Sequence, residues 1–331
     1  MKSWTLKYAN GQREQLEDWS QVNWRRVRKI VTNLRRRIFR DRKLGQWKQL
    51  RRLQKLLIKN YANLLLSVRQ ITQINSGKNT AGVDGEVVNT PEQRVKLVKS
   101  WNNVKALPTR RVFIPKANGK ERPLGIPTVR DRVMQNIVKQ SLEPEWEAVF
   151  EANSYGFRPG RSCQDSIAQC WIKLNASPRT GGHTWVLDAD IKGFFDNIAH
   201  ESILKQLGSF PGKKLIKEWL KAGFIYEGNL YETETGTPQG GVISPLLANI
   251  GLHGLEEIIK KTNSKLGIIR YADDFVVTAK DKGNLENVLI LIKQWLSERG
   301  LEISEEKTSI RSIEKGFNFL GFNLRHYRES I

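Results

Sequence analysis

Apolar residues recur through residues 22–71 at the three- and four-residue spacing of an amphipathic α-helix. One stripe comprises Val27, Ile30, Val31, Leu34 and Ile38, and a second comprises Leu50, Leu53, Leu57, Tyr61 and Leu64. Gly45 lies between the two stripes and is a poor helix former, so the pattern predicts two helices that are separated at this residue.

Further helical stripes alternate with short β-rich runs along the rest of the chain. Residues 129–150, 246–259 and 284–299 have helical spacing and are expected to form core helices. Residues 110–127 are predicted to form a strand, a turn at 118–120 and a returning strand. Close to the C-terminus, another hairpin is predicted by Phe317, Phe319 and Phe322.

A pair of acids interrupts two apolar runs at residues 267–277. Asp273 and Asp274 follow Tyr271 and Ala272, and a β-rich run lies on each side, so they are expected at the tip of a hairpin. Neighbouring carboxylates that repel each other and lose water favour a divalent cation and a third acid. Asp190, which follows the short strand predicted at 185–187, is the candidate third acid. The alternative interpretation of an Asp-Asp pair is a solvated turn.

Two such clusters of carboxylates are typical of nucleotidyl transfer with Mg²⁺. Hard divalent cations prefer oxygen ligands. Two of these ions about 3.5 to 4 Å apart activate an attacking hydroxyl and stabilise the leaving oxygen at phosphorus.

Composition and charge favour a globular protein with a polyanionic partner. Of the 331 residues, 39% are hydrophobic, and 55 Lys and Arg exceed 34 Asp and Glu to give a net charge of +21. Cys163 and Cys170 form neither a disulfide framework nor a zinc-binding spacing. With no signal peptide and no run of about 18 apolar residues, we expect a cytoplasmic location, nucleoid-associated in a bacterium or its organellar equivalent, and no membrane partner.

Positive charge is concentrated in residues 24–59, which hold fifteen Lys or Arg and a single acid, Asp41. This imbalance favours an RNA-binding helical arm, although a solvated helix face is the alternative. A second Gly- and Arg-rich segment, 154–162, suits phosphate contact, but its arginines are equally suited to structural ion pairs. The candidate nucleic-acid-binding residues are Arg25, Arg26, Arg28, Lys29, Arg35, Arg36, Arg37, Arg158 and Arg161.

Several strings, taken together and in this order, resemble a reverse transcriptase of the group II intron type. They are Arg111-Val112-Phe113-Ile114-Pro115-Lys116, Ser154-Tyr155-Gly156-Phe157-Arg158-Pro159-Gly160, the aromatic turn after Asp190, Gly236-Thr237-Pro238-Gln239-Gly240-Gly241, Tyr271-Ala272-Asp273-Asp274 and Phe319-Leu320-Gly321-Phe322. The resemblance extends from about residue 75 to the C-terminus.

The resemblance implies an α+β right-hand polymerase fold with an antiparallel palm sheet. We expect a basic RNA-binding arm at 1–70, mainly fingers with a supporting palm helix at 71–182, and mainly palm at 183–331. Part of 198–236 is expected to return to the fingers. Group II intron enzymes continue into a thumb with splicing (maturase) function, a DNA-binding region and sometimes an endonuclease. Because the sequence ends at Ile331, we expect these regions to be absent, with the chain a fragment or a separate chain supplying the thumb.

The same resemblance implies the reaction and its residues. Asp190, Asp273 and Asp274 would be catalytic and, together with Ile191, would bind two Mg²⁺ ions, for which Mn²⁺ is a substitute. Lys116 and Arg122 would hold the phosphates of a dNTP, Phe195 would exclude a 2′-hydroxyl, Gln239 would lie along the nucleotide, and Lys307 would protonate the leaving pyrophosphate. The expected partners are an RNA template, expected to be intron RNA, and a DNA primer. The alternatives are a splicing cofactor that binds intron RNA and a domesticated reverse transcriptase of a defence system.

Overall fold

The computed structural model describes residues 16–102, 105–115, 119, 121–175 and 182–326. The chain divides into two compact units. Unit 1 comprises residues 1–149 and 204–244, and unit 2 comprises residues 150–203 and 245–331. The boundary between residues 203 and 204 lies within helix α8 (His200–Gln206), and the boundary between residues 244 and 245 lies within helix α10 (Ser244–Gly251).

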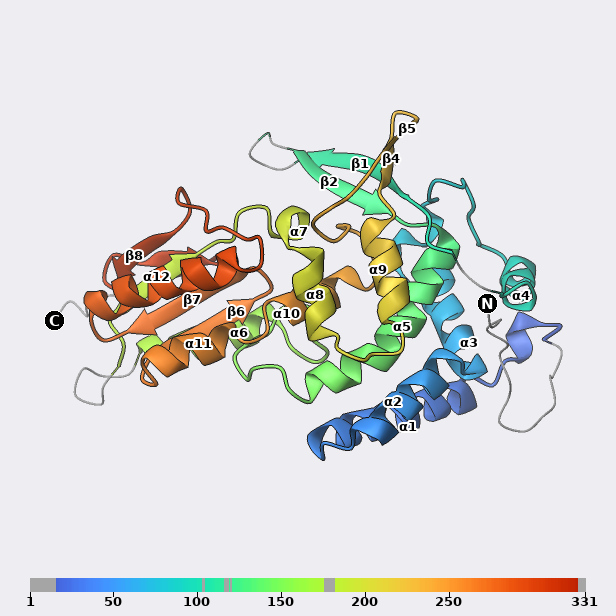
Figure 1. Cartoon of the computed structure of the whole chain (residues 1–331), viewed down its shortest axis with the longest axis horizontal. Helices are drawn as coiled ribbons and strands as arrows, with labels where there is room; N and C mark the ends of the chain where they lie inside the picture. The colour runs from blue at the N-terminus through green and yellow to red at the C-terminus, as the bar shows by residue number, and fades with distance from the viewer. Residues whose placement is uncertain (1–15, 103–104, 116–118, 120, 176–181, 327–331) are drawn as a thin grey trace. The chain divides into compact units, whose positions relative to one another are not determined.

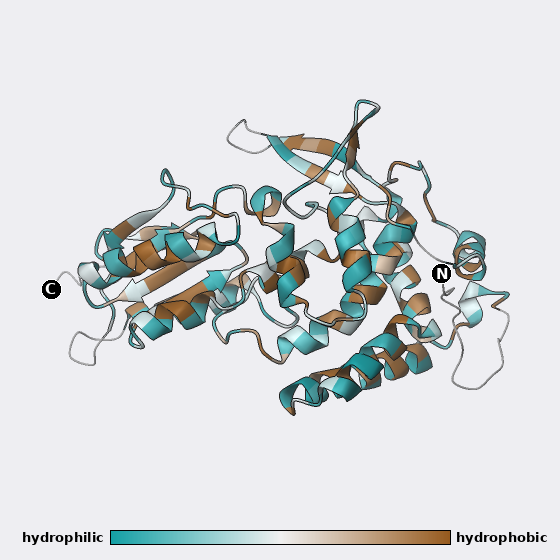
Figure 2. Ribbon diagram, in the orientation of Figure 1, coloured by the Kyte–Doolittle hydropathy of each residue, from teal (hydrophilic) through white to brown (hydrophobic). Residues whose placement is uncertain are grey.

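Unit 1 is built on a group of packed helices. α1 (Trp24–Lys43), α2 (Trp47–Ile58) and α3 (Tyr61–Arg69) pack against one another or against α5 (Val129–Glu147), and α1 and α2 lie side by side (Figure 1). Their apolar stripes supply fully buried side chains such as Ile38, Leu50 and Leu57. Both colours appear along α1 and α2 in Figure 2, as expected for helices with one face in a core and one in solvent. The unit also contains α4 (Pro91–Lys99) and α9 (Lys213–Lys221).

A four-stranded sheet completes unit 1, in the order β2-β1-β4-β5. β1 (Thr109–Pro115) and β2 (Glu121–Ile126) pair antiparallel, and β4 (Phe224–Tyr226) adds to β1 in parallel before turning into β5 (Asn229–Tyr231). The sheet therefore joins two segments of the chain that lie about a hundred residues apart.

Unit 2 is organised around a second four-stranded sheet in the order β6-β7-β3-β8 (Figure 1). Its strands are β3 (Trp185–Ala189), β6 (Gly267–Tyr271), β7 (Asp274–Ala279) and β8 (Ser309–Ser312), and every pairing is antiparallel. β9 (Phe317–Phe319) and β10 (Phe322–Leu324) form a separate hairpin.

Helices cover this sheet. α12 (Lys282–Ser297) packs along β3, β7 and β8, and α11 (Leu255–Thr262) packs on α12. α6 (Cys163–Leu174) contributes Cys170 and Leu174 to a buried cluster that includes Ile269 and Val276. The remaining helix, α7 (Phe194–Asn197), follows β3.

The structure confirms most of the expected elements and corrects two. Residues 22–71 contain three α-helices instead of two, because Asn60 caps a separate helix by accepting from the Ala62 and Asn63 amides. The single helix expected at 246–259 is wrong, because the chain breaks before α11 at Gly254, whose φ of +100° is incompatible with a continuous helix. Among the helices that the structure describes, none is both long and apolar enough to cross a membrane.

Candidate active site

The register of the unit 2 sheet brings the predicted carboxylates together. Tyr271 pairs with Asp274, so β6 and β7 are joined by a loop of two residues, Ala272 and Asp273. Ala189, the last residue of β3, pairs with Phe275 of β7. The next residue in β3's direction is Asp190, and the residue before Phe275 is Asp274. The two acids therefore lie side by side at one end of the sheet.

A segment from the C-terminal part of unit 2 holds Asp190 in place. The Ser304 amide donates to the Asp190 carbonyl over 2.8 Å. The Lys307 ammonium donates to Asp190 Oδ2, also over 2.8 Å. This hydrogen bond, followed by the nearby negative charges, raises the pKa of Lys307 although partial burial opposes the shift. Ile191 is buried and forms an isolated β-bridge with Ile303.

The electrostatics of the carboxylates suit a hard divalent cation. Loss of water, and then the charges of Asp273 and Asp190, raise the pKa of Asp274 to about 7. A cation with oxygen ligands would offset the mutual repulsion of these carboxylates. No ready-made group of three or more His, Cys, Asp or Glu metal ligands is found among the described residues. The fit therefore rests on the chemistry of the oxygen donors.

An aromatic cluster follows Asp190. Gly193 has a φ of +53°, which lets the chain turn sharply into α7. The ring of Phe195 is 8% exposed and lies edge-on to Phe194 at 5.3 Å and to Phe157 at 6.4 Å. Phe194 is more deeply buried, at 2% exposure, as expected for a packing residue.

Two of the predicted nucleotide-binding residues meet in unit 1. Arg122 on β2 donates from Nε to Gln239 Oε1 over 2.7 Å, although the residues are 117 positions apart. The Gly125 amide donates to the Gln239 carbonyl, and a Cβ on Gly240 would lie 2.8 Å from the Gly125 carbonyl oxygen. Glycine at this position therefore permits the loop to lie against β2. Lys116 lies outside the described residues.

The candidate arginines of the helical arm differ in their surroundings. Arg35 is half-buried and donates to the Gln140 carbonyl and to Glu143, which ties α1 to α5. The other candidates on α1 are exposed: Arg25, Arg26, Arg28, Lys29, Arg36 and Arg37.

The two candidate arginines of unit 2 contribute to the fold. Arg158 is 7% exposed and donates to the Glu151 and Ser154 carbonyls. Arg161 is half-buried and donates to the Ala152 and Ser154 carbonyls. Their proposed contact with nucleic acid stays a prediction.

One residue next to the carboxylates was missed from the sequence. Arg270 is the fourth residue of β6, is 2% exposed, and bonds to the carbonyl of Ala272 in the carboxylate loop. An arginine within a run of apolar strand residues was the available indication, since a buried charge requires partners.

Known protein families and proteins are similar in sequence to this chain. Residues 114–324 match the family model for reverse transcriptase (RNA-dependent DNA polymerase), and residues 19–101 match the model for the N-terminal domain of reverse transcriptase. Protein YkfC of Escherichia coli is 32% identical, with 86% of this chain and 87% of YkfC covered. Group II intron-encoded protein LtrA of Lactococcus lactis is 31% identical, with 76% of this chain and 53% of LtrA covered, so the chain spans about half of that relative.

A solved structure supports the fold alone. Apo telomerase from Candida tropicalis has a TM-score of 0.50 and 12% identity, with 67% of this chain and 47% of the telomerase covered. That neighbour agrees with a right-hand polymerase fold of mixed helices and antiparallel sheets. Enzymes of the matched family act on RNA templates and use divalent metal ions. From the family match over most of its length and from its relatives, the chain belongs to the reverse transcriptase family of RNA-dependent DNA polymerases.

Proposed function

We propose that this chain extends a DNA primer on an RNA template, with Asp190, Asp273 and Asp274 as the catalytic carboxylates. The primer 3′-hydroxyl attacks the α-phosphorus of a dNTP, the bond to the β-phosphate breaks, and pyrophosphate leaves. The observation that supports this most directly is the register of β3 and β7, which pairs Ala189 with Phe275 and so sets Asp190 beside Asp274.

The carboxylates and Ile191, through its main-chain carbonyl, would hold two Mg²⁺ ions, with Mn²⁺ as a substitute. Bound there, the ions would lower the pKa of the attacking hydroxyl and stabilise charge on the leaving oxygen. Lys307, whose raised pKa keeps its ammonium charged at neutral pH, would place a proton close to the departing pyrophosphate.

Each unit holds residues proposed to contact a nucleotide. In unit 1, Arg122 and Lys116 would contact the phosphates, and Gln239 would lie along the base pair without adding charge. In unit 2, Phe195 would collide with a ribose 2′-hydroxyl. The hydrogen bond between Arg122 and Gln239 supports treating these two side chains as one element of the site.

The test is primer extension on an RNA template with dNTPs and Mg²⁺, comparing the chain with its Asp273→Asn variant. Loss of one metal-binding carboxylate is expected to slow synthesis about a thousandfold or more while RNA binding is retained. Asp281→Asn is the matched control, because Asp281 caps α12 and asparagine caps equally well. Synthesis at an undiminished rate by Asp273→Asn would contradict the assignment.

A second function, binding of intron RNA as a splicing cofactor, is favoured by the exposed basic residues of α1. Here we expect glutamine at Arg25, Arg26, Arg28 and Lys29 to abolish splicing of a group II intron RNA and to spare extension on a generic template. Splicing that is unaffected by these substitutions would contradict a splicing role for these residues.

A further inference from the structure

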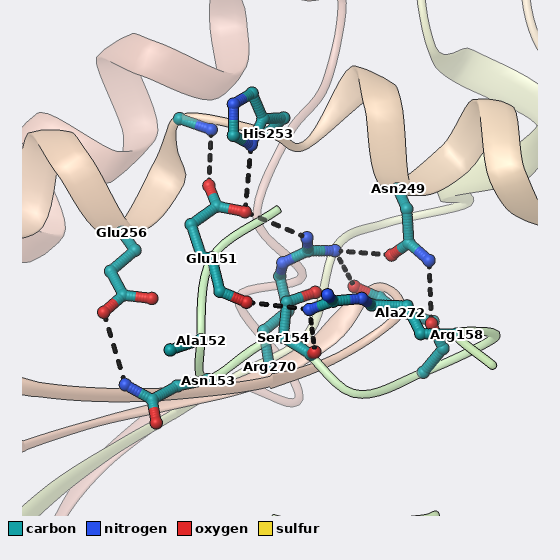
Figure 3. Close-up of polar contacts among 12 residues, drawn as sticks. Glu151, Ala152, Asn153, Ser154, Arg158, Asn249, His253, Glu256, Arg270 and Ala272 are labelled. Carbon is teal, nitrogen blue, oxygen red and sulfur yellow. Dashed lines mark hydrogen bonds and ion pairs between the residues drawn. The ribbon is translucent and has the colours of Figure 1, made fainter. Parts of the chain in front are cut away.

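Arg270 lies beneath the loop that carries the catalytic carboxylates. Its side chain is 2% exposed, and its Nη1 donates to both the Ala272 carbonyl and Asn249 Oδ1, each over 3.0 Å (Figure 3). Its main chain is held as well, because the Arg270 amide donates to the Asn153 carbonyl and the Tyr155 amide donates to the Arg270 carbonyl. Arg270 is therefore held both at its guanidinium and at its main chain.

The positive charge of Arg270 has a half-buried counterion in Glu151. Arg270 Nη2 lies 3.8 Å from Glu151 Oε2, His253 Nδ1 lies 3.1 Å from the same oxygen, and the Gly254 amide donates to Oε1 over 2.6 Å (Figure 3). Burial alone would raise the pKa of Glu151, but the bond and charge of His253, the charge of Arg270 and the Gly254 amide lower it to about 2. The carboxylate is thus charged at neutral pH and holds the guanidinium in one orientation.

The backbone above Arg270 is strained and tightly packed. Ala272 has a φ of +58°, a conformation that residues with a Cβ rarely adopt. A Cβ on Gly156 would overlap the Ala272 amide, so only glycine at position 156 lets these two segments of the chain lie this close together. Asn249, which accepts from Arg270, also donates to the Gly156 carbonyl over 2.7 Å. One side chain therefore links the arginine to the segment that packs on the loop.

We propose that Arg270 is a positioning residue that orients the catalytic loop, with Asn249 and Glu151 fixing its guanidinium. The Ala272 carbonyl and the Asp273 amide belong to one planar peptide group. A hydrogen bond that fixes this carbonyl therefore sets the direction in which the backbone of Asp273, and then Asp274, continues. Displacements near 1 Å in such a constellation have large effects on rate. This inference rests on the proposed polymerase function.

The substitution that tests the inference is Arg270→Lys in the full chain. Lysine keeps a positive charge, but it lacks the planar fork whose Nη1 serves Ala272 and Asn249 while Nη2 faces Glu151. We expect the single-turnover rate of extension to fall at least tenfold and the Mg²⁺ concentration for half-maximal rate to rise severalfold. The KM for dNTP should change less than twofold, because the side-chain partners of Arg270, namely Ala272, Asn249 and Glu151, are not proposed nucleotide-binding residues. Arg299→Lys is the matched control: Arg299 also donates to a backbone carbonyl, that of Trp295, within unit 2.

A readout independent of activity is Mn²⁺ binding, followed by electron paramagnetic resonance of the free ion. We expect Arg270→Lys to weaken Mn²⁺ binding severalfold, and Arg299→Lys to leave it unchanged. Glycine reaches positive φ without strain, so the Ala272→Gly background should recover part of the rate lost in Arg270→Lys. If Arg270→Lys does not fold, Asn249→Ala tests the same hydrogen bonds and should shift rate and Mn²⁺ affinity in the same direction.

The outcomes separate this inference from the proposed function. An inactive Asp273→Asn variant together with wild-type rate and Mn²⁺ affinity in a folded Arg270→Lys variant would overturn the positioning role alone. Synthesis that persists in Asp273→Asn would overturn the function itself. Equal losses in Arg270→Lys and Arg299→Lys, with unchanged Mn²⁺ affinity, would reduce Arg270 to a structural residue.

Discussion

Arg270 of unit 2 and the exposed arginines of α1 in unit 1 are used in opposite ways. In unit 2, Arg270 is buried, donates to the Ala272 carbonyl and to Asn249, and lies 3.8 Å from the Glu151 carboxylate. On α1 of unit 1, Arg36 and Arg37 are exposed, as are four further basic residues that precede them. Removing a buried charge's partner is costly, whereas an exposed ion pair contributes little. The buried arginine is therefore informative about the precision of a site, and the exposed arginines about the charge of a partner.

This difference has a consequence for how each region responds to solution conditions. Exposed charges are screened within about 8 to 10 Å at ordinary ionic strength, so their contribution should depend on salt. Buried ionic networks are screened far less and should depend on pH instead, through the groups that must stay ionised.

The largest effect expected from the contrast between buried and exposed charges is a loss of stability of unit 2 in acid. The pKa of Glu151 in the folded protein is about 2, below its ordinary value of 4.5. Its stabilisation is therefore complete above about pH 5 and is lost as the pH falls toward 2, at a cost of up to about 3 kcal/mol. Denaturant unfolding between pH 5 and 2 should show a shallower pH dependence in Glu151→Gln than in the wild type.

The control for this experiment is Glu305→Gln, which removes an exposed acid paired with Lys293 at 2.6 Å. It should keep the wild-type pH dependence. If the free energy of unfolding depends on pH with the same slope in the wild type and in Glu151→Gln, the network around Glu151 is not the source of acid sensitivity. The contrast between buried and exposed ion pairs would then be wrong for this residue.

A smaller effect is expected at Phe195, which is buried yet proposed to face the sugar. Removal of the ring in Phe195→Ala should raise acceptance of rNTPs relative to dNTPs about 10- to 100-fold, measured as the ratio of kcat/KM values. Phe194→Leu is the control, because Phe194 is a buried packing residue next to Phe195 in the chain. It should lower the melting temperature without changing that ratio. Discrimination that survives in Phe195→Ala would contradict the proposed role.

The smallest effect is expected from a single exposed charge on α1. Arg36→Gln should weaken binding of single-stranded RNA about fivefold near 0.1 M salt and lower the slope of log K against log salt by about 0.7. Fluorescence anisotropy of a labelled RNA over a salt series measures both. Lys261→Gln on α11, where Lys261 pairs with Glu257 at the surface, should change neither quantity. An unchanged slope in Arg36→Gln would place the RNA elsewhere.

Local patterns were sufficient for the parts of the fold in which neighbouring residues decide the structure. The hairpin of β6 and β7, the hairpin of β1 and β2, and helices α5 and α12 follow from periodicity and turn residues, and all four are observed. The break between α10 and α11 was not predicted, because the apolar stripe continues across Gly254 and only its φ of +100° ends the helix. The short strands β4 and β5 have three residues each, too few for a periodic pattern.

The amino-acid sequence by itself determined the chemistry available to this protein: which carboxylates, cations and aromatic rings are present, and which of them lie at turns or strand ends. Only the tertiary structure decided which of them meet. The contact of Arg122 with Gln239 spans 117 positions, and that of Lys307 with Asp190 also spans 117. The partners of Arg270 come from three separate segments of the chain. Such contacts are set by strand register and helix packing, since no local pattern encodes the distance between segments that are far apart in the chain.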